Sequence, residues 1–525
     1  MVCAELIIQI KNKFPAFNAL EVSQAYADEV RLKVEPSLFK NTCLTLHKIL
    51  PSPVMMFFAE DQRAGRGCFV LNCQFVSFKK GQWVSVYADI PDDQACFESL
   101  ARDIYSASLF EREIQEMFGI LPQGNPDLRR LNLHDETWPQ GNFPLRKDFR
   151  NIQPASLGEY KFAKIEGEGI FEIPVGPVHA GIIAPGHFRF SAAGEPIVNL
   201  EIRLGFTHRG VEKLFEKKAP GDCLRLSEAV AGDSAFSHSL AFTMAAEKIS
   251  ALTICAQASY LRAIFLELER AYNHLNSIGG IATDVGFSFP SAFAAILKEE
   301  ILQLNQQLSG SRYLKNINLI GGIASGINQE KRKLLLKSLK AIKRDFEELV
   351  KILYNSVSFM DRVESTGLLH RKTAEDLGIV GLAARASGIP TDLRQYFPSV
   401  YQKAGFQMAR EESGDALARL NIRVAEFRQS IRLIEEFTSL LKDNEEIRTE
   451  SSLKPGSALG YVEAWRGPVL YWLKINEDGL IERCKIVDAS FHNWQALAYA
   501  VLGNIIPDFP LCNKSFDLSY TGNDL

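Results

Sequence analysis

Apolar and polar residues follow two different patterns along this chain. Up to about residue 150, short apolar runs alternate as half-buried strands do, and they predict strands at 54–59, 68–78 and 82–88. A pattern with three- and four-residue spacing predicts a helix over 94–117, which Gly119 ends by taking the left-handed conformation. Residues 1–150 are therefore predicted to form a small α/β domain.

Helical spacing dominates the rest of the chain. A hairpin comes first, with strands at 187–190 and 197–204. Apolar residues then recur every three or four positions, with charges on the opposite face. This predicts helices at 223–232, 237–257, 259–279, 291–308, 329–362 and 413–442. A late hairpin, 468–475 and 480–487, precedes the tail.

These patterns predict an α+β protein with two domains. The small domain at 1–150 is followed by a polar linker at 151–170, which contains Pro154 and Gly158. Residues 171–525 are expected to form a mainly α-helical domain with peripheral β-hairpins. A length of 525 residues fits this division, because it exceeds what one compact core holds.

The composition limits where the protein can be located and which partners it can have. A net charge of −4 without a basic stripe gives no reason to expect a nucleic-acid partner. The N-terminal apolar run is too short for a signal peptide, and the longest apolar stretch, 250–268, is broken by Arg262 and Glu267. We therefore expect a cytosolic protein or a soluble subunit docked on a larger assembly.

The nine cysteines are scattered, and no two of them form Cys-x-x-Cys. This spacing fits reduced core thiols better than a disulfide framework. Several common catalytic signatures are also missing: the sequence has no Walker loop, no G-x-G-x-x-G behind a strand, no H-E-x-x-H and no G-x-S-x-G. Direct binding of nucleotide or NAD therefore has no support in the sequence.

Several ordered motifs carry a family resemblance. They are GPVHAGIIAPGHFRFSAAGEPIVNLEIRLGFTHRGVE at 176–212, ELERAYNHLNSIGGIATDVG at 267–286, LIGGIAS at 319–325, GLAARASGIPTDLRQYFP at 381–398 and EAWRG at 463–467. This part resembles the large subunit of membrane-bound, complex I-related [NiFe] hydrogenases of the formate hydrogenlyase and hydrogenase-4 type. It is equally similar to the homologous quinone-site (49-kDa) subunit of complex I.

The N-terminal domain resembles the 30-kDa subunit of complex I, through EREIQEMFGI at 111–120 and NPDLRRLNLHDETWPQGNFPLRKD at 125–148. Fusion of the two parts is typical of the hydrogenase branch. The resemblance implies an oxidoreductase subunit of a respiratory, NADH dehydrogenase-like type that is linked to NAD and quinone. It also implies a partner small subunit with an Fe–S cluster, antiporter-like membrane subunits, and a peripheral place on the cytoplasmic side of the inner membrane.

The sequence departs from the hydrogenase pattern at the metal ligands. That family binds nickel and iron through two Cys-x-x-Cys pairs, whose four thiolates are soft ligands. Here the four ligand positions fall on Ala231, Ser234, Ser519 and Gly522, while His238 keeps its place in the pattern. A methyl group, two hydroxyls and a hydrogen cannot replace four thiolates. We therefore expect no Ni–Fe centre and no other resident metal.

The complex I branch implies a quinone headgroup in the same pocket. His187 matches the family's histidine and Asp284 matches its aspartate partner, a pair that could protonate a reduced carbonyl oxygen. The family's tyrosine has no counterpart, because 226–242 contains none. His179, His187 and His238 are the pocket candidates, and His187, Asp284 and Arg385 are the catalytic candidates.

Each candidate also has a structural interpretation. His187 could satisfy loop carbonyls, His179 is more simply structural, and Asp284 could be an ordinary loop carboxylate. Arg385 could pair with Asp392 or with another core carboxylate. Three functions stay open at this point: an electron-transferring subunit with a quinone-like acceptor, a redox-inert coupling subunit of the same complex, and a genuine hydrogenase.

Overall fold

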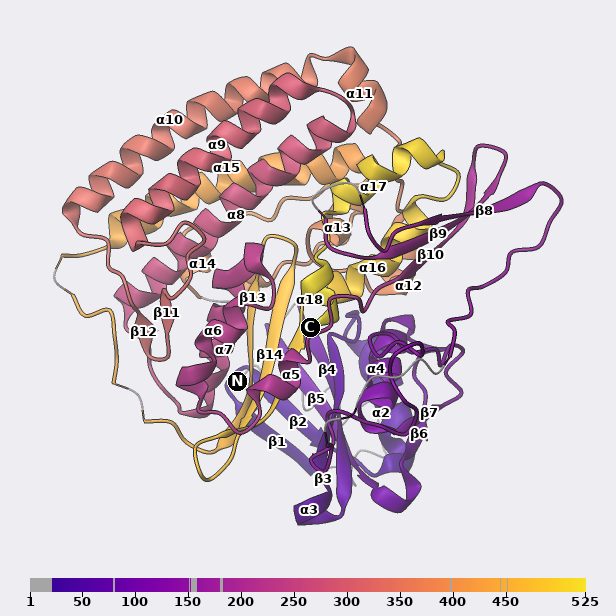
Figure 1. The fold of residues 1–525 in the computed structure, drawn as a ribbon. Coiled ribbons are helices and arrows are strands. Elements are labelled where there is room, and N and C mark those ends of the chain that lie inside the picture. The colour runs from indigo at the N-terminus through magenta and orange to yellow at the C-terminus, as the bar shows by residue number, and fades with distance from the viewer. Residues whose placement is uncertain are drawn as a thin grey trace. The chain divides into compact units, whose positions relative to one another are not determined.

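The computed structural model describes residues 21–78, 81–150, 152, 158–179, 183–396, 399–443, 445–450 and 452–525. The chain divides into two compact units. The first holds residues up to Lys164 together with 203–206 and 375–379, and the second holds the remainder. Figure 1 colours the ribbon from indigo to yellow along the chain. The predicted linker at 151–170 is only partly described, and its limits stay a prediction.

A five-stranded sheet forms the centre of the first unit, in the order β1-β2-β5-β4-β3. Strands β2 and β5 run parallel, and the other neighbours run antiparallel. All ten residues of β4 are buried, so both faces of this strand are covered. The strands and the two longer helices are β1 Glu21–Tyr26, β2 Glu29–Lys33, β3 Met56–Gln62, β4 Cys68–Ser77, β5 Gln82–Pro91, α2 Pro36–Ile49 and α4 Ser108–Phe118.

The predicted helix over 94–117 is wrong in its first half. Strand β6 (Cys96–Glu98) lies there and pairs in parallel with β7 (Leu121–Gln123). The carboxylate of Glu111 accepts bonds from the Ser99 hydroxyl at 2.6 Å and from the Leu100 N–H at 2.6 Å, which holds this backbone in a non-helical form. Helix α4 occupies the second half, and Gly119 ends it in the left-handed conformation as predicted.

Small sheets flank the second unit. The predicted first hairpin is confirmed as β9 (His187–Ala193) and β10 (Ile197–Arg203), and β8 (Ile170–Val175) extends it to the order β10-β9-β8. The late hairpin is confirmed as β14 (Pro468–Ile475) and β15 (Ile481–Val487). A strand that the sequence analysis missed, β13 (Gly456–Glu463), pairs with β14 along eight residues.

Helices build the rest of the second unit. They are α5 Val211–Phe215, α6 Leu224–Glu228, α7 Ala235–Ile249, α8 Ala256–Asp284, α9 Ser288–Ser309, α10 Gln329–Tyr354, α11 Val357–Val363, α13 Gly381–Ala386, α14 Ser399–Lys403, α15 Ala416–Leu440, α16 Ala489–Ala500, α17 Phe509–Phe516 and α18 Tyr520–Asp524. Figure 1 shows α8, α9, α10 and α15 side by side, in agreement with their contacts. Within the described ranges, no helix is both long and apolar enough to span a bilayer.

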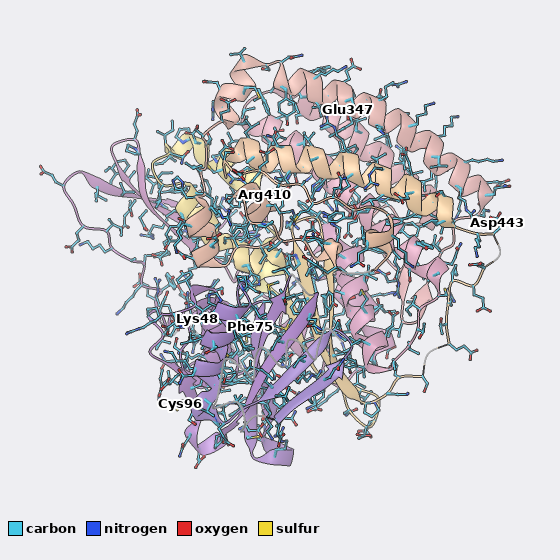
Figure 2. All side chains as sticks on the ribbon, turned by 180° about the vertical axis from the view of Figure 1, so that it is seen from behind. Lys48, Phe75, Cys96, Glu347, Arg410 and Asp443 are labelled. Carbon is cyan, nitrogen blue, oxygen red and sulfur yellow. The ribbon has the colours of Figure 1, made fainter. Side chains whose placement is uncertain are left out.

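Helix α8 lies at the centre of this bundle and is buried on almost every side. Its charged residues therefore need partners from neighbouring helices and strands. The outer helix α10 is instead tied to α15 at its surface, where the Arg428 guanidinium lies 2.7 Å from Glu347. Figure 2 labels Glu347 on this outer helix. The interior of the second unit thus contains charge, and the candidate site lies beside that charge.

Three predicted helices are shorter than expected. The helix predicted over 237–257 ends at Ile249, and α8 begins at Ala256. The continuous helix over 329–362 breaks at Asn355 and Ser356, because the Ser356 hydroxyl caps α11 by accepting from the Phe359 N–H. The helix predicted over 223–232 reduces to α6 and a 3₁₀ turn, Gly232–Ser234. Two of the four ligand positions, Ala231 and Ser234, lie at this turn.

Candidate functional site

The four ligand positions lie on two segments that the fold brings together. Ala231 and Ser234 flank the 3₁₀ turn before α7, and each is 1% exposed. Ser519 caps the start of α18, where its hydroxyl accepts from the Gly522 N–H at 2.9 Å. Asp488 joins the two segments: His238 of α7 bonds to it, and Gly522 packs directly against it.

The hydroxyl of Ser234 is already used in hydrogen bonds. It accepts from the indole N–H of Trp465 at 3.0 Å and donates to Asp233 at 3.1 Å. Trp465 is 2% exposed, and its ring lies edge-on to His274. The indole therefore fills the space beside Ser234.

Arg466, the next residue, ties the first segment to the tail. Its guanidinium donates two bonds to the Asp233 carboxylate, at 2.6 and 3.0 Å, and its Nε bonds to the carbonyl of Asp517. It also stacks on the Trp465 ring at 3.9 Å from the centroid. A bidentate pair of this kind fixes geometry as well as charge. Trp465 and Arg466 together hold the two segments in one place.

Gly522 has no room for a side chain. A Cβ atom built there would lie 2.9 Å from Cγ of Asp488. Asp488 cannot easily move aside, because it caps α16 by accepting from the Ser490 N–H at 2.7 Å and bonds to His238 on its other oxygen. Glycine at this position is therefore matched to the aspartate beside it.

His238, Tyr471 and Asp488 form a hydrogen-bonded row. The Nδ1 atom of His238 lies 3.0 Å from the Tyr471 hydroxyl, and its Nε2 atom lies 3.3 Å from the Asp488 carboxylate. All three are buried. Burial alone would raise the pKa of Asp488, but its hydrogen bond from His238 and the charges of His238 and Arg466 lower that pKa to about 2. The ionised aspartate accepts from Nε2 of His238, and the Tyr471 hydroxyl lies within hydrogen-bonding distance of Nδ1.

The complex I resemblance implies a bond between His187 and Asp284, and that bond stays a prediction. The Nδ1 atom of His187 lies 3.2 Å from the Gly176 carbonyl. Asp284 ends α8, where burial raises its pKa, the Lys514 charge opposes the rise and the Asp517 charge adds to it. Next to His187, Phe188 contacts Trp494, whose ring packs on Tyr520 near the C-terminus.

The other predicted site residues have structural partners. His179 bonds to the carbonyl of Gly186 at 2.8 Å. Arg385 is fully buried in α13 and bonds to Glu463 at 2.8 Å and to Glu426 at 2.7 Å, with Asp392 at 3.3 Å. This is the pairing that the structural interpretation of Arg385 expected. The loop residues 180–182 and the motif residues 397–398 lie outside the described part of the chain.

Comparisons with known proteins identify the family of the chain. A family model described as the respiratory-chain NADH dehydrogenase 30 Kd subunit matches residues 32–154, and one described as the 49 Kd subunit matches 284–454. Hydrogenase-4 component G of Escherichia coli (strain K12) is 30% identical over 527 residues, covering 99% of this chain and 92% of that relative. The chain belongs to the family of fused 30-kDa and 49-kDa complex I-related subunits.

Other members and a solved structure extend the match. Formate hydrogenlyase subunit 5 of Escherichia coli (strain K12) is 30% identical over 480 residues, covering 89% of this chain and 84% of that protein. A chain of the membrane-bound sulfane sulfur reductase, an archaeal respiratory membrane complex, matches in fold with a TM-score of 0.64 at 23% identity, covering 68% of this chain and 99% of that chain. The predicted resemblance and the predicted fold class are confirmed.

Sequence reasoning about this family member missed three parts of the site: Trp465, Asp233 and Asp488. The bond from Trp465 to Ser234 spans 231 positions, so no local pattern reveals it. Nothing in the sequence indicated that Asp488 belongs to the site, because an aspartate before a helix is a common N-cap.

Proposed function

We propose that this chain is the peripheral large subunit of a membrane-associated oxidoreductase complex, without a Ni–Fe centre of its own. It would take electrons from the Fe–S cluster of a partner small subunit and pass them to a quinone-like acceptor, coupled to ion movement by antiporter-like subunits. It would lie on the cytoplasmic side of the membrane. The names of its relatives, which include a formate hydrogenlyase subunit and a hydrogenase-4 component, support membership of such a complex.

The proposal that this chain has no Ni–Fe centre rests on the residues at the four ligand positions. None of them carries sulfur, the Ser234 hydroxyl is bonded to Trp465, and the Ser519 hydroxyl caps α18. Gly522 has Asp488 where a ligand side chain would begin. Nickel and iron of this type need soft thiolate ligands. The residues present do not fit the cluster, so no step of the proposed reaction passes through it.

Metal analysis tests this part directly. We expect the purified intact complex to contain iron from its partner's clusters and nickel far below one atom per chain, measured by mass spectrometry of the metals. A relative that carries all four cysteines, purified in the same way, serves as the control. One nickel per copy of this chain would overturn the proposal and leave the hydrogenase alternative.

The acceptor step is tested at His187 and Asp284 in the assembled complex. If these residues deliver protons to a quinone-like acceptor, His187→Ala and Asp284→Asn should each lower turnover with a soluble quinone analogue by about 10²-fold, the usual size of a general acid–base contribution. His47→Gln is the matched control, because that histidine lies on α2 of the first unit, where its Nδ1 atom is 2.9 Å from the Ser52 carbonyl.

A redox-inert coupling role is the alternative, and the filling of the site favours it. Trp465 and Arg466 occupy the space beside the ligand positions with a fixed indole and a bidentate ion pair. In that case turnover and ion transport would be unchanged by both substitutions while the partners still bind. That result would reject electron transfer through this subunit and leave it as a coupling element.

A further inference from the structure

A buried ionic cluster lies directly behind the Trp465 loop. It consists of three arginines and four carboxylates: Arg270, Arg385, Arg394, Glu267, Asp392, Glu426 and Glu463. Their side chains are at most 1% exposed. They come from α8, α13, α15, β13 and the loop around Asp392, so five parts of the second unit meet there.

The four carboxylates are not equally neutralised. Glu426 lies 2.7 Å from Arg385, 3.3 Å from Arg394 and 3.4 Å from Arg270. Asp392 and Glu267 each face two arginines as well: Arg385 and Arg394 for Asp392, and Arg270 and Arg394 for Glu267. Glu463 faces one arginine, Arg385, and receives its other bond from the uncharged Leu393 N–H at 3.1 Å.

The charges in the cluster do not cancel. Four carboxylates against three guanidinium groups leave one negative charge in excess. His274 bonds to Glu426 at 3.0 Å, but burial lowers its pKa to about 4, so it is neutral near pH 7. Arg423 hydrogen-bonds to the carbonyls of Arg419 and Phe516 and reaches Glu426 only through its charge, so the cluster carboxylate that it helps to neutralise is Glu426. An uncompensated charge away from water is costly, and a carboxylate removes that cost by binding a proton.

We propose that Glu463 is a proton-binding site, which takes up one proton from bulk water by forming an O–H bond on the carboxylate oxygen. The charges around Glu463 favour this residue over the other three carboxylates as the proton-binding site. Burial and the Asp392 charge raise the pKa of Glu463 to about 7 against the opposing charges of Arg385 and Arg394, whereas the pKa values of Glu267, Asp392 and Glu426 are lowered because their arginines outweigh burial. Glu463 therefore changes its charge near pH 7.

Glu463 is joined to the candidate site by a short stretch of backbone. Arg270 donates to the carbonyls of Glu463 at 2.6 Å and Ala464 at 3.0 Å, which fixes the backbone that carries Trp465 and Arg466. The His274 ring lies against Trp465 on one side and bonds to Glu426 on the other. Negative charge that arrives beside Trp465 would raise the proton affinity of Glu463. This coupling rests on the proposed function, whereas the proton site itself does not.

Infrared spectroscopy of the full chain tests the proton site. Between about pH 5 and pH 9, wild type should lose the carbonyl bands of its protonated glutamates, and Glu463→Gln should lack one of them. Glu116 and Glu269 supply internal references, because burial raises their pKa values to about 7 and about 8. Glu116→Gln, in the first unit, is the matched control and should remove a different band.

The thermal midpoint gives a second readout with a defined sign. The folded-state pKa of Glu463 lies above the unfolded value, so its stabilisation is present below about pH 4.5 and is lost as the pH rises through about 7. The Tm of Glu463→Gln should therefore change less than that of wild type between about pH 5 and pH 8. Should Glu463→Gln fail to fold, Glu463→Asp must shift the same infrared band.

Two results would overturn the proposal or its coupling. If Glu463→Gln and Glu463→Asp leave every titrating carbonyl band in place, the proton is not on Glu463. In the assembled complex, Glu463→Gln should flatten the pH dependence of turnover between about pH 6 and pH 8, because glutamine stays uncharged throughout. An unchanged turnover profile together with the lost band would keep the proton site and reject its coupling to electron transfer.

Discussion

Arg385→Ala is expected to unfold the second unit near room temperature or to prevent its folding. The substitution leaves Glu463 without its arginine and takes one arginine each from Glu426 and Asp392. Breaking a buried ion pair by removing one partner costs about 3–5 kcal/mol, and here three carboxylates are affected at once. Soluble yield and calorimetric melting of the full chain measure the effect.

Variants at the same cluster separate charge from shape. Arg385→Lys keeps the positive charge but loses the planar guanidinium that reaches two carboxylates. It should therefore lower the free energy of unfolding, but by less than Arg385→Ala does. Glu463→Gln removes the excess negative charge and should leave the free energy of unfolding almost unchanged. If Arg385→Ala melted within a degree or two of wild type, the cluster would not hold the second unit together.

Trp465→Ala is expected to destabilise the second unit by about 3–5 kcal/mol, the usual cost of truncating a buried tryptophan. The indole fills the space beside Ser234, stacks with Arg466 and lies edge-on to His274. Its loss leaves a cavity and takes away the donor to the Ser234 hydroxyl. Calorimetric melting of the full chain reports the loss.

Trp465→Phe is the control for this prediction. Phenylalanine keeps the larger part of the ring volume but loses the five-membered ring with the N–H that donates to Ser234. The lost hydrogen bond should cost about 1 kcal/mol, so this variant should be less destabilised than the alanine variant. A phenylalanine variant as unstable as the alanine variant would show that the hydrogen bond, and not the filled volume, dominates. An alanine variant with unchanged stability would mean that the neighbouring side chains close the space without strain.

Local patterns predicted most of the fold. The hairpins at β9–β10 and β14–β15 followed from alternation around short turns, and α8, α9 and α15 followed from apolar spacing. The failures had non-local causes. Residues 96–98 form a strand because they pair with 121–123, and the carboxylate of Glu111 fixes the turn between. No spacing rule contains that partner.

The sequence predicted which segments form the candidate site, but it did not predict the hydrogen bonds within that site. Motif matching placed the four ligand positions and His238, and the structure brings these segments together. The bonds that decide the chemistry run between distant residues: Trp465 to Ser234, Arg466 to Asp233, and Asp488 to His238. The pairing of His187 with Asp284 came from the complex I resemblance alone and stays a prediction.

The contact between Asp488 and Gly522 bears on whether a metal site could be built at the four ligand positions. Four cysteine substitutions at 231, 234, 519 and 522 would not by themselves recreate a metal site, because the new side chain at 522 would meet a carboxylate that caps α16 and bonds to His238. The indole of Trp465 would also have to leave the space beside residue 234. A lineage that regained the metal would therefore have to change residues that never bound it, and each intermediate would carry a destabilised interior.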